Sequence, residues 1–440
     1  MMLFRSGRHL PEEKRTADSP IVTAPLPQKA ILPLNQHVGI PAKLVVQIHS
    51  RVQTGQIVAA ADGFISANLH ASISGEIASI GPHQHPDGSL SECIVIESDG
   101  MDEKIGFDSR RPETLSSEDI LFRVRAAGIV GLGGAAFPTH VKLEPPKDRK
   151  IDNLILNGCE CEPYLTADHR VMLEETDKVL GGLVLAMRAL GVQTGIIAIE
   201  DNKPDALAGF AESIRRFPQV RVVSVKAAYP QGSEKQLIKT VLRREVPSGK
   251  LPMDIGCVVQ NVQTAKAIHD AVCDGTPLVE RVLTVTGSVK RPANIRVRIG
   301  TPLSDLIDFC GGLTGDIRKL IFGGPMMGLS QTALDVPVIK GTSGVVALSA
   351  KEAKRIPPTR CIRCGRCVEA CAMGLVPMMM GRLMERGRTD ALDEWSYSDC
   401  MECGRCSYEC PAKIPLLHYI RVAKVLGRKK QTVKEMDSAL

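Results

Sequence analysis

Two cysteine runs near the carboxyl end constrain this 440-residue chain more than any other feature of its sequence. Both runs follow the spacing C-x2-C-x2-C-x3-C, in which three thiols lie close together and a fourth follows. Three closely spaced thiolates can wrap one iron–sulfur cubane, and this spacing is typical of [4Fe–4S] clusters. The sequence therefore predicts two such clusters. The expected ligands are Cys361, Cys364, Cys367 and Cys371 in the first run, and Cys400, Cys403, Cys406 and Cys410 in the second.

The two runs are expected to share their ligands. In ferredoxins with two clusters, the fourth cysteine of each run ligates the cluster of the other run. We therefore expect Cys410 to complete the cluster of the first run and Cys371 to complete that of the second. Zinc sites are a weaker alternative because they usually separate two C-x2-C pairs widely. Disulfides are unexpected in a chain of this length and composition.

The bulk composition excludes several classes of protein. Lys and Arg total 55 and Asp and Glu total 49, which gives a net charge of +6, and aromatic residues make up 3% of the chain. A modest charge and few aromatic side chains argue against a nucleic-acid partner. We find no stretch of about 18 uncharged apolar residues and no apolar signal core at the amino terminus. We therefore expect neither a membrane span nor a signal peptide.

The pattern along the chain predicts a multidomain α/β protein. Short apolar runs punctuated by glycines predict a barrel-sandwich β module. Strands that alternate with helices predict a Rossmann-like parallel sheet, including one long helix over Leu173–Leu190. The expected parts are an extended proline-rich arm over 1–35, a barrel-sandwich domain over 36–100, an α/β domain over 115–275, a β-grasp (SLBB-like) element over 280–345, a helical two-[4Fe–4S] ferredoxin-like domain over 355–425 and a basic tail over 426–440.

A glycine-rich segment, residues 128–138, precedes the first strand of the predicted parallel sheet. Gly131, Gly133 and Gly134 carry no Cβ, so backbone N–H groups there could approach a phosphate or a flavin closely. Lys142 follows shortly afterwards and could meet phosphate charge. A flexible surface connector is the alternative, because the segment is not in the G-x-G-x-x-G register of a dinucleotide-binding turn.

Polar side chains follow directly after the apolar strand expected at Asn153–Leu156. Open α/β sheets bind ligands at the carboxyl ends of their strands, so this loop is a candidate binding site. Asn157 offers both a donor and an acceptor to the edge of a flavin ring. Glu160 and Glu162 could bind ribityl or ribose hydroxyls, and a solvated acidic loop is the alternative for these two carboxylates.

Together these segments resemble a known family. The glycine-rich segment and the acidic loop look like the flavin site of the NADH-oxidising flavoprotein subunit of respiratory complex I. Tyr229, in the sequence YPQGSE, and Asn261 and Thr264, in the sequence NVQT, fall where that family places further FMN contacts. The whole layout, including HLPEEK at 9–14 and PLNQHVGIPA at 33–42, is similar to the RnfC family, whose members belong to the Rnf ion-translocating electron-transport complex.

The resemblance implies non-covalent FMN at the residues named above, NADH as electron partner, and two [4Fe–4S] clusters that carry single electrons. It also implies a peripheral subunit on the cytoplasmic face of the cell membrane, which works with the other subunits of an ion-translocating complex. A ferredoxin-type carrier would be an indirect partner. The chain departs from the complex I pattern at three positions, with Leu132 in place of arginine, Ala136 in place of glycine and Cys159 in place of aspartate.

Two other functions fit parts of the pattern. A stand-alone soluble NADH-dependent flavoprotein with iron–sulfur clusters, of the cobalamin-reductase kind, has a similar core. A non-enzymatic scaffold could carry the clusters and dock partners through its β module and basic tail. The proline-rich arm followed directly by the β module favours membership of the complex.

Overall fold

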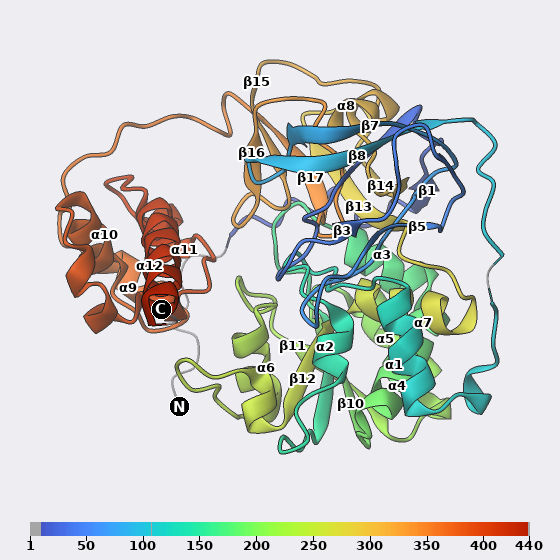
Figure 1. Cartoon of the computed structure of the whole chain (residues 1–440). Helices are drawn as coiled ribbons and strands as arrows, with labels where there is room; N and C mark the ends of the chain where they lie inside the picture. The colour runs from blue at the N-terminus through green and yellow to red at the C-terminus, as the bar shows by residue number, and fades with distance from the viewer. Residues whose placement is uncertain (1–9, 107, 439–440) are drawn as a thin grey trace.

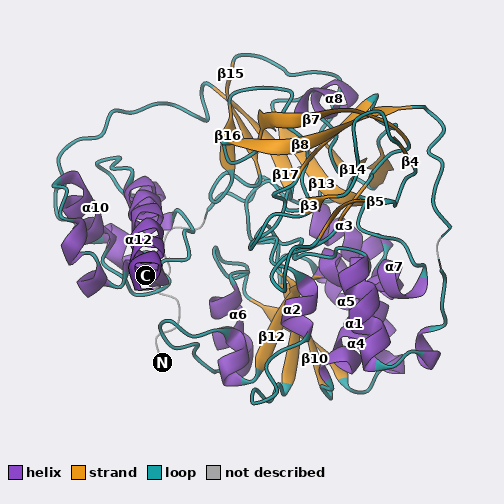
Figure 2. Ribbon diagram, viewed as in Figure 1, coloured by secondary structure: helices purple, strands orange, loops and turns teal. Residues whose placement is uncertain are grey.

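The computed structural model describes residues 10–106 and 108–438, with side chains described up to residue 427. Figure 1 shows three regions: a β-rich upper half built from blue and yellow-to-orange segments, an α/β lower half in green, and red carboxyl-terminal helices to one side. Strands in Figure 2 gather in the upper half and in the sheet of the lower half, whereas the carboxyl-terminal region is drawn as helices and loops.

The α/β domain is built on a four-stranded sheet whose strands are all parallel, in the order β11-β10-β9-β12. Its strands are nearly continuous apolar runs, as expected where helices cover both faces of a parallel sheet. The strands are β9 (Asn153–Gly158), β10 (Thr194–Glu200), β11 (Val220–Val225) and β12 (Cys257–Asn261). The helices are α1 (Ser117–Ala126), α2 (Thr139–Leu143), α3 (Ala167–Glu174), α4 (Thr176–Leu190), α5 (Pro204–Ser213), α6 (Glu234–Leu242) and α7 (Val262–Cys273).

The strand order of this sheet reverses beside β9. The chain passes from β9 to β10 and β11 in one direction and then returns to place β12 on the other side of β9. Ligands of open α/β sheets bind at the carboxyl ends of the strands where the order reverses. Asn157 of β9 and Asn261 of β12 are paired in register at this point. The fold therefore brings these two predicted site residues to the edge of the sheet where ligands of such folds bind, and we call this edge the crevice.

The long helix expected over Leu173–Leu190 is divided between α3 and α4, so that prediction is wrong at one position. The break falls at Glu175, whose backbone leaves the helical region. The Glu175 carboxylate pairs with the Arg296 guanidinium and lies 3.5 Å from the Lys266 ammonium. We attribute the break to these ion pairs with neighbouring elements, which helical periodicity does not report.

The amino-terminal β module consists of two small antiparallel sheets, ordered β2-β8-β7-β4 and β3-β5-β6. Buried aliphatic side chains, among them Ile77, Ile94 and Ile96, fill its interior. Its strands are β2 (Lys29–Pro33), β3 (Lys43–Leu44), β4 (Arg51–Val52), β5 (Ile57–Ala60), β6 (Leu69–His70), β7 (Gly75–Gln84) and β8 (Leu90–Ser98).

The proline-rich segment before this module is not the free-standing arm that its composition predicts, as far as the described residues from 10 onward show. β1 (Ile21–Thr23) runs parallel to β14 (Ala293–Arg298) in a neighbouring sheet, and β2 is a member of the barrel-sandwich sheet. The prolines lie outside these two strands or at the end of β2, so the strand N–H groups remain free to pair.

The β-grasp element is a six-stranded mixed sheet in the order β1-β14-β13-β17-β15-β16. Leu303, Leu306 and Ile307 of one helix pack into its core. Its own strands and helix are β13 (Glu280–Gly287), β14 (Ala293–Arg298), β15 (Ile317–Phe322), β16 (Leu329–Gln331), β17 (Gly344–Ser349) and α8 (Leu303–Phe309).

The carboxyl-terminal region contains an internal repeat. Each half has a glycine with φ of 75°, Gly365 or Gly404, directly before a short helix, and a proline, Pro377 or Pro415, at the start of a longer one. The helices are α9 (Arg366–Glu369), α10 (Pro377–Glu385), α11 (Arg405–Glu409) and α12 (Leu416–Ser438). The predicted basic tail begins at residue 426, and from residue 428 onward its side chains lie outside the described part of the structure. Among the helices described, none is long and apolar enough to cross a membrane.

Candidate functional site

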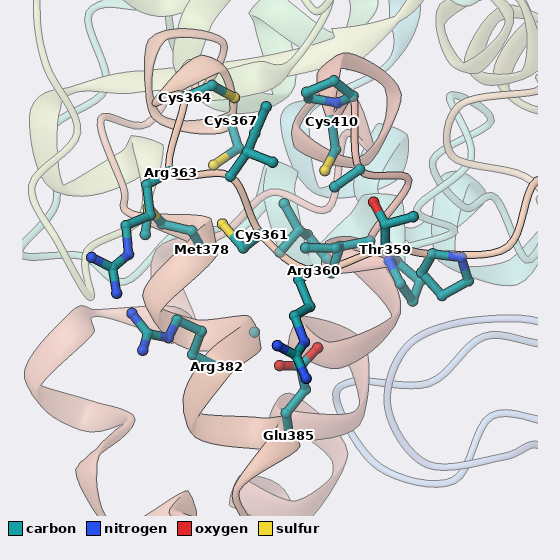
Figure 3. A pocket seen from close by; sticks show the side chains of 18 of the residues that line it. Thr359, Arg360, Cys361, Arg363, Cys364, Cys367, Met378, Arg382, Glu385 and Cys410 are labelled. Carbon is teal, nitrogen blue, oxygen red and sulfur yellow. The ribbon is translucent and has the colours of Figure 1, made fainter.

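Four of the eight predicted ligands surround one cavity of about 520 Å³ in the carboxyl-terminal region. We call them the outer set: Cys361, Cys364, Cys367 and Cys410. Figure 3 shows that Cys361, Cys367 and Cys410 direct their sulfurs into the space between the loops. Cys410 belongs to the second run, so the structure brings the two runs together as crossed ligation requires.

The other four cysteines form a second group, the inner set: Cys371, Cys400, Cys403 and Cys406. Burial, and then the nearby thiols of Cys400 and Cys371, raise the pKa of Cys403 to about 11. Burial and the Cys403, Cys400 and Cys371 thiols raise the pKa of Cys406 to about 12. These thiols can influence one another only at short range, so Cys371 of the first run lies with the second run.

Both sets fit a [4Fe–4S] cluster by the chemistry of their donors. Each offers four thiols, the ligand number of a cubane. Within the inner set, the Leu375 N–H lies 3.3 Å from Cys371 Sγ and the Glu402 N–H lies 3.4 Å from Cys400 Sγ. Backbone N–H groups aimed at ligand sulfurs stabilise thiolates and tune the reduction potential of a cluster.

The two sets differ in their access to solvent. Cys361 and Cys364 of the outer set are exposed, whereas every member of the inner set is buried or half-buried. The inner set also lies at the junction with the α/β domain. Two thiols of the outer set, by contrast, face the surroundings.

Two reciprocal hydrogen bonds form this junction. The Tyr229 hydroxyl donates to the backbone carbonyl of Cys403 at 2.7 Å, and the Arg405 guanidinium donates to the Tyr229 carbonyl at 2.6 Å. Nearby, the Gln236 amide donates to the Ala372 carbonyl at 2.8 Å. Tyr229, which the resemblance assigns to FMN, therefore also contacts the inner cysteine run directly.

The glycine-rich segment lies over the first turn of α7. The Leu132 N–H donates to Thr264 Oγ1 at 2.8 Å, and a Cβ added at Gly133 would lie 3.3 Å from the Asn261 Cβ. Gly134 has φ of 102° and open space where a Cβ would point. The close contact disfavours a side chain at Gly133, and the left-handed backbone favours glycine at Gly134. The segment therefore forms a bare backbone cradle beside the crevice.

Asn157 and Asn261 are held by neighbours at the base of the crevice. The Asn157 amide donates to the Gly232 carbonyl at 2.8 Å, which ties the turn after Tyr229 to β9. The Asn261 oxygen accepts from the N–H groups at the start of α7, and its amide donates to Asp168 at 2.6 Å. Burial raises the pKa of Asp168, and a nearby residue of α7 supplies this carboxylate with a second donor.

The two predicted carboxylates are held by protein backbone. Glu160 accepts from the N–H groups of Asp168 and His169 at 2.7 and 3.1 Å, and so caps the start of α3. Glu162 accepts from the N–H groups of Met326 and Met327 at 3.2 and 2.8 Å. Neither is the solvated loop carboxylate of the alternative interpretation, because burial raises the pKa of both.

Lys142 also has protein partners. Its ammonium donates to the Glu234 carboxylate at 2.7 Å and to the Val259 carbonyl at 3.1 Å. These contacts place Lys142 between α6 and the middle of β12. Phosphate binding by Lys142 remains a prediction. It would require the Lys142 ammonium to leave the Glu234 carboxylate and contact the phosphate in its place.

Lys14 is a functional candidate that the sequence reasoning did not single out. Its buried ammonium donates to the carbonyls of Glu160, Glu162 and Leu165 at 2.6, 2.9 and 2.6 Å. Burial lowers its pKa. Lys14 therefore fixes the acidic loop from the amino-terminal segment. The sequence HLPEEK at 9–14 was noted only as part of the family resemblance. Nothing in its residue spacing indicates that Lys14 contacts a loop about 150 residues away.

The Met326–Met327 turn is a second feature that no local pattern identifies. Glu162 holds its N–H groups, and the Met326 carbonyl lies 2.7 Å from the position of a Cβ on Gly404. The turn thus fills the space between the acidic loop and the inner cysteine run. The crevice, the turn and the inner set form one continuous contact path.

Comparisons with known proteins agree with this layout. Family models match in four places: an RnfC barrel sandwich hybrid domain at 2–101, a Nuo51 FMN-binding domain at 124–270, an SLBB domain at 282–330 and a 4Fe-4S dicluster domain at 360–414. These matches confirm the predicted fold class. They also confirm FMN and [4Fe–4S] clusters as the cofactors, and the bare cradle and the two thiol sets fit those groups.

Curated relatives match nearly the whole chain. The C subunit of the proton-translocating ferredoxin:NAD(+) oxidoreductase complex of Clostridium ljungdahlii is 48% identical over 97% of this chain and 94% of its own length. The C subunit of the Na(+)-translocating ferredoxin:NAD(+) oxidoreductase complex of Acetobacterium woodii is 45% identical, over 96% of each. Among solved structures, an NAD+-reducing [NiFe]-hydrogenase in the air-oxidized state has a TM-score of 0.53 at 19% identity. The match covers 71% of this chain and 64% of that one, and it shows the fold alone. The chain belongs to the RnfC family, the C subunits of ion-translocating oxidoreductase complexes.

Proposed function

We propose that this chain is a peripheral subunit of an ion-translocating membrane complex that passes electrons between NAD(H) and a ferredoxin-type carrier. The route would run through FMN at the crevice, then the inner cluster, then the outer cluster. Family membership supports the electron partners and the other subunits of the complex as partners. The cytoplasmic face is part of the proposal, because NADH and ferredoxin are found there.

The observation that carries the proposal is the bond between Tyr229 and Cys403. It joins the turn beside the ligand crevice to the loop of the inner set at 2.7 Å. Since Arg405 donates back to the Tyr229 carbonyl, the two elements are held together in both directions. A flavin in the crevice and a cluster in the inner set would thus lie on either side of one short contact.

The binding roles of the crevice residues follow from their positions. Gly133 and Gly134 would offer backbone N–H groups to a phosphate, and Lys142 would balance its charge. Gly131 would shape the turn, because its N–H donates to the Phe137 carbonyl at 2.8 Å. Asn157, Asn261 and Thr264 would orient the ring and the ribityl chain from the carboxyl ends of β9 and β12. Glu160 and Glu162 would act mainly by shaping the loop and the Met326–Met327 turn, and Tyr229 by closing the site towards the inner set.

FMN, when bound, supplies the ability to take two electrons as a hydride and to release them singly. The protein's task is to hold the groups in fixed positions and to exclude water. The buried inner set, the aliphatic core around α12 and the N–H groups that point at sulfur serve that task. The departures Leu132, Ala136 and Cys159 fall at buried positions of the same site.

A stand-alone soluble NADH-dependent reductase remains the second candidate function, since it would use the same crevice and clusters. The two functions differ in their requirement for other proteins of a complex. Affinity purification of the tagged chain from its own membranes, followed by identification of co-purifying proteins, separates them. Recovery with integral membrane proteins of the complex supports the first function, and quantitative recovery of the chain alone in the soluble fraction supports the reductase.

Anaerobic purification tests the proposed route. The full chain should contain FMN and about eight irons, four per cubane, and its visible colour should bleach on addition of NADH. Cys410→Ala should remove about four irons and leave NADH-dependent bleaching of the inner cluster. The matched control is Cys310→Ala, which changes a buried cysteine of the β-grasp core. This variant should keep the full iron content. A wild-type protein with intact clusters that NADH does not bleach would contradict the proposal.

A further inference from the structure

A buried arginine of the β-grasp element has no acidic partner. Arg281 of β13 is 3% exposed. Burial lowers the pKa of its guanidinium to about 10, so the side chain remains charged at neutral pH. Asp168 is the nearby carboxylate, and its oxygens accept from the side-chain amides of Asn261 and Gln263. Arg281 forms no ion pair with any acidic residue that the structure describes. A buried charge without a counter-ion is costly, so an anion from outside the chain is expected near it.

The hydrogen bonds of the Arg281 side chain all end on backbone carbonyls. Its Nη2 group donates to the Leu132 carbonyl in the glycine-rich segment at 3.3 Å, and its Nη1 group donates to the Lys340 carbonyl at 2.6 Å. The Lys340 ammonium in turn donates to the Gly128 carbonyl, at the start of the same segment, at 2.8 Å. Two cations of the β-grasp element therefore hold the glycine-rich segment from one side.

These contacts fix the direction of the free N–H groups in the cradle. In a trans peptide the C=O and the N–H point to opposite sides. Because the guanidinium holds the Leu132 carbonyl, the Gly133 N–H of the same peptide points away from the β-grasp element. The Gly134 carbonyl lies 3.4 Å from the position of a Cβ on Gly341, so it also faces the β-grasp element and the Ala135 N–H points away. Neither N–H has a hydrogen-bond partner in the described part of the chain, and neighbouring N–H groups of this kind bind anions.

We propose that Arg281 is a positioning residue of the cofactor site, which orients the peptides of the cradle and supplies the buried positive charge that a bound phosphate group needs. The inference rests on the proposed function, because it needs FMN or NAD(H) at the crevice. Lys142 can add its charge only after leaving Glu234, whereas Arg281 has no ion pair to break. The complex I pattern has an arginine where this chain has Leu132, so β13 supplies a cation that the loop itself lacks.

The ligand chemistry is a phosphate group, and the crevice has two sources of it: the monophosphate of FMN and the pyrophosphate of NAD(H). Both bind to backbone N–H groups without a covalent step. A cation behind a peptide group favours the anion in front of it through its charge and by polarising the N–H that faces the anion. A phosphate-free analogue of the same ligand gains nothing from this effect and is therefore the appropriate comparison.

The test compares ligands with and without phosphate on the full-length, cluster-loaded chain. Quenching of flavin fluorescence gives the affinities of the flavin-free chain for FMN and riboflavin, and calorimetry gives those of the FMN-loaded chain for ADP-ribose and adenosine. In the wild type, FMN should bind at least about tenfold more tightly than riboflavin. Inorganic phosphate should compete with FMN and should not weaken riboflavin binding.

Arg281→Met should reduce the preference for FMN over riboflavin by about tenfold, and Arg281→Lys, which keeps the charge, should retain most of it. The matched control is Arg298→Met. Arg298 lies on β14, which pairs with β13, and its charge is balanced by Asp102 at 2.6 Å. This variant removes the same charge from the same sheet and should leave the preference unchanged. Iron content and riboflavin affinity show that each variant is folded.

The outcomes separate the two sources of phosphate from a purely structural role. A smaller preference for FMN in Arg281→Met supports the inference with the flavin as the source, and a smaller preference for ADP-ribose over adenosine supports it with the dinucleotide as the source. Equal weakening of ligands with and without phosphate would make Arg281 a packing residue and overturn the inference, as would unchanged preferences in the folded variant. If Arg281→Met does not fold, failure of inorganic phosphate to compete in the wild type would overturn it. Wild-type clusters that NADH does not bleach would instead refute the proposed function, and the phosphate preference could still be measured.

Discussion

A single methyl group at Gly404 should uncouple the flavin domain from the inner cluster. A Cβ at this position would lie 2.7 Å from the backbone carbonyl of Met326, in the turn that Glu162 holds. Gly365 is its equivalent in the first run, with the same φ of 75° and open space around a Cβ. Gly365→Ala is therefore a matched control for the backbone strain of Gly404→Ala.

The two substitutions separate strain from contact. Alanine in left-handed backbone costs about 1–2 kcal/mol at either glycine. Overpacking against a backbone atom adds about 1–3 kcal/mol at Gly404 alone. A difference of 1.4 kcal/mol is a factor of ten in an equilibrium constant. Gly404→Ala should therefore shift the loop that carries Cys403 and Gly404 towards its undocked state by roughly 5- to 150-fold more than Gly365→Ala shifts the equivalent loop of the first run.

Stopped-flow spectroscopy measures the effect of this difference on the rate of cluster reduction. After mixing with NADH, Gly365→Ala should bleach its clusters at close to the wild-type rate, and Gly404→Ala should bleach slowly or incompletely at the same iron and FMN content. Iron and flavin analysis excludes loss of cofactor as the cause. If both variants bleach at the same rate, the contact between Met326 and Gly404 plays no part in electron transfer and the reasoning is refuted.

Three further predictions rest on other contacts. Tyr229→Phe removes the hydrogen bond to the Cys403 carbonyl, which contributes about 1 kcal/mol, so NADH-driven cluster reduction should slow by about fivefold in the same stopped-flow assay while FMN content stays constant. Lys14→Met leaves three buried carbonyls without their donor and should lower the free energy of unfolding by about 3 kcal/mol in urea titrations, whereas exposed Arg15→Met should change it little. Burial lowers the pKa of Lys340 from 10.5 to about 7, so between these values the folded state binds fewer protons than the unfolded state. The contribution of Lys340 to the unfolding free energy should then rise with pH by up to about 1.4 kcal/mol per pH unit. The urea midpoints of wild type and Lys340→Met should therefore differ more at pH 9 than at pH 7. An equal difference at the two pH values would contradict this prediction.

Local spacing predicts the cluster ligands and the order of domains, and the ligation of iron by the eight cysteines stays a prediction. Cysteine spacing needs no tertiary information, because three ligands of each set lie within one loop. The parallel sheet was also predictable, since β9, β10 and β11 alternate with helices along the chain, whereas β12 was not predicted. The site at Asn157 follows from the general behaviour of such sheets, whereas Asn261 was assigned to it only by the family resemblance.

Long-range contacts account for what was missed. The proline-rich segment was expected to be a separate arm, yet β1 pairs with a strand more than 270 residues away in sequence (Ile21 with Asn294). Lys14 reaches carbonyls at 160–165, and Glu162 reaches N–H groups at 326 and 327. No periodicity or spacing in the chain encodes such pairs. The same holds for Glu175, which ends a helix through ion pairs to β14 and α7.

The carboxylates show how burial changes a prediction of function. Glu160 and Glu162 were expected either to bind hydroxyls or to lie in solvent. Both are half-buried acceptors of backbone N–H groups, and burial raises the pKa of each. The solvated alternative is therefore wrong, and hydroxyl binding stays a prediction. Residue type predicted an acceptor correctly, while the partner depended on which segments the fold brought alongside.

Electron paramagnetic resonance of the anaerobic full-length protein after addition of NADH tests the central claim most directly. The account predicts flavin and about eight irons, with signals from two reduced [4Fe–4S] clusters, of which the outer one disappears in Cys410→Ala and the inner one in Cys371→Ala. Zinc in place of iron, or clusters that dithionite reduces but NADH leaves oxidised, would contradict it.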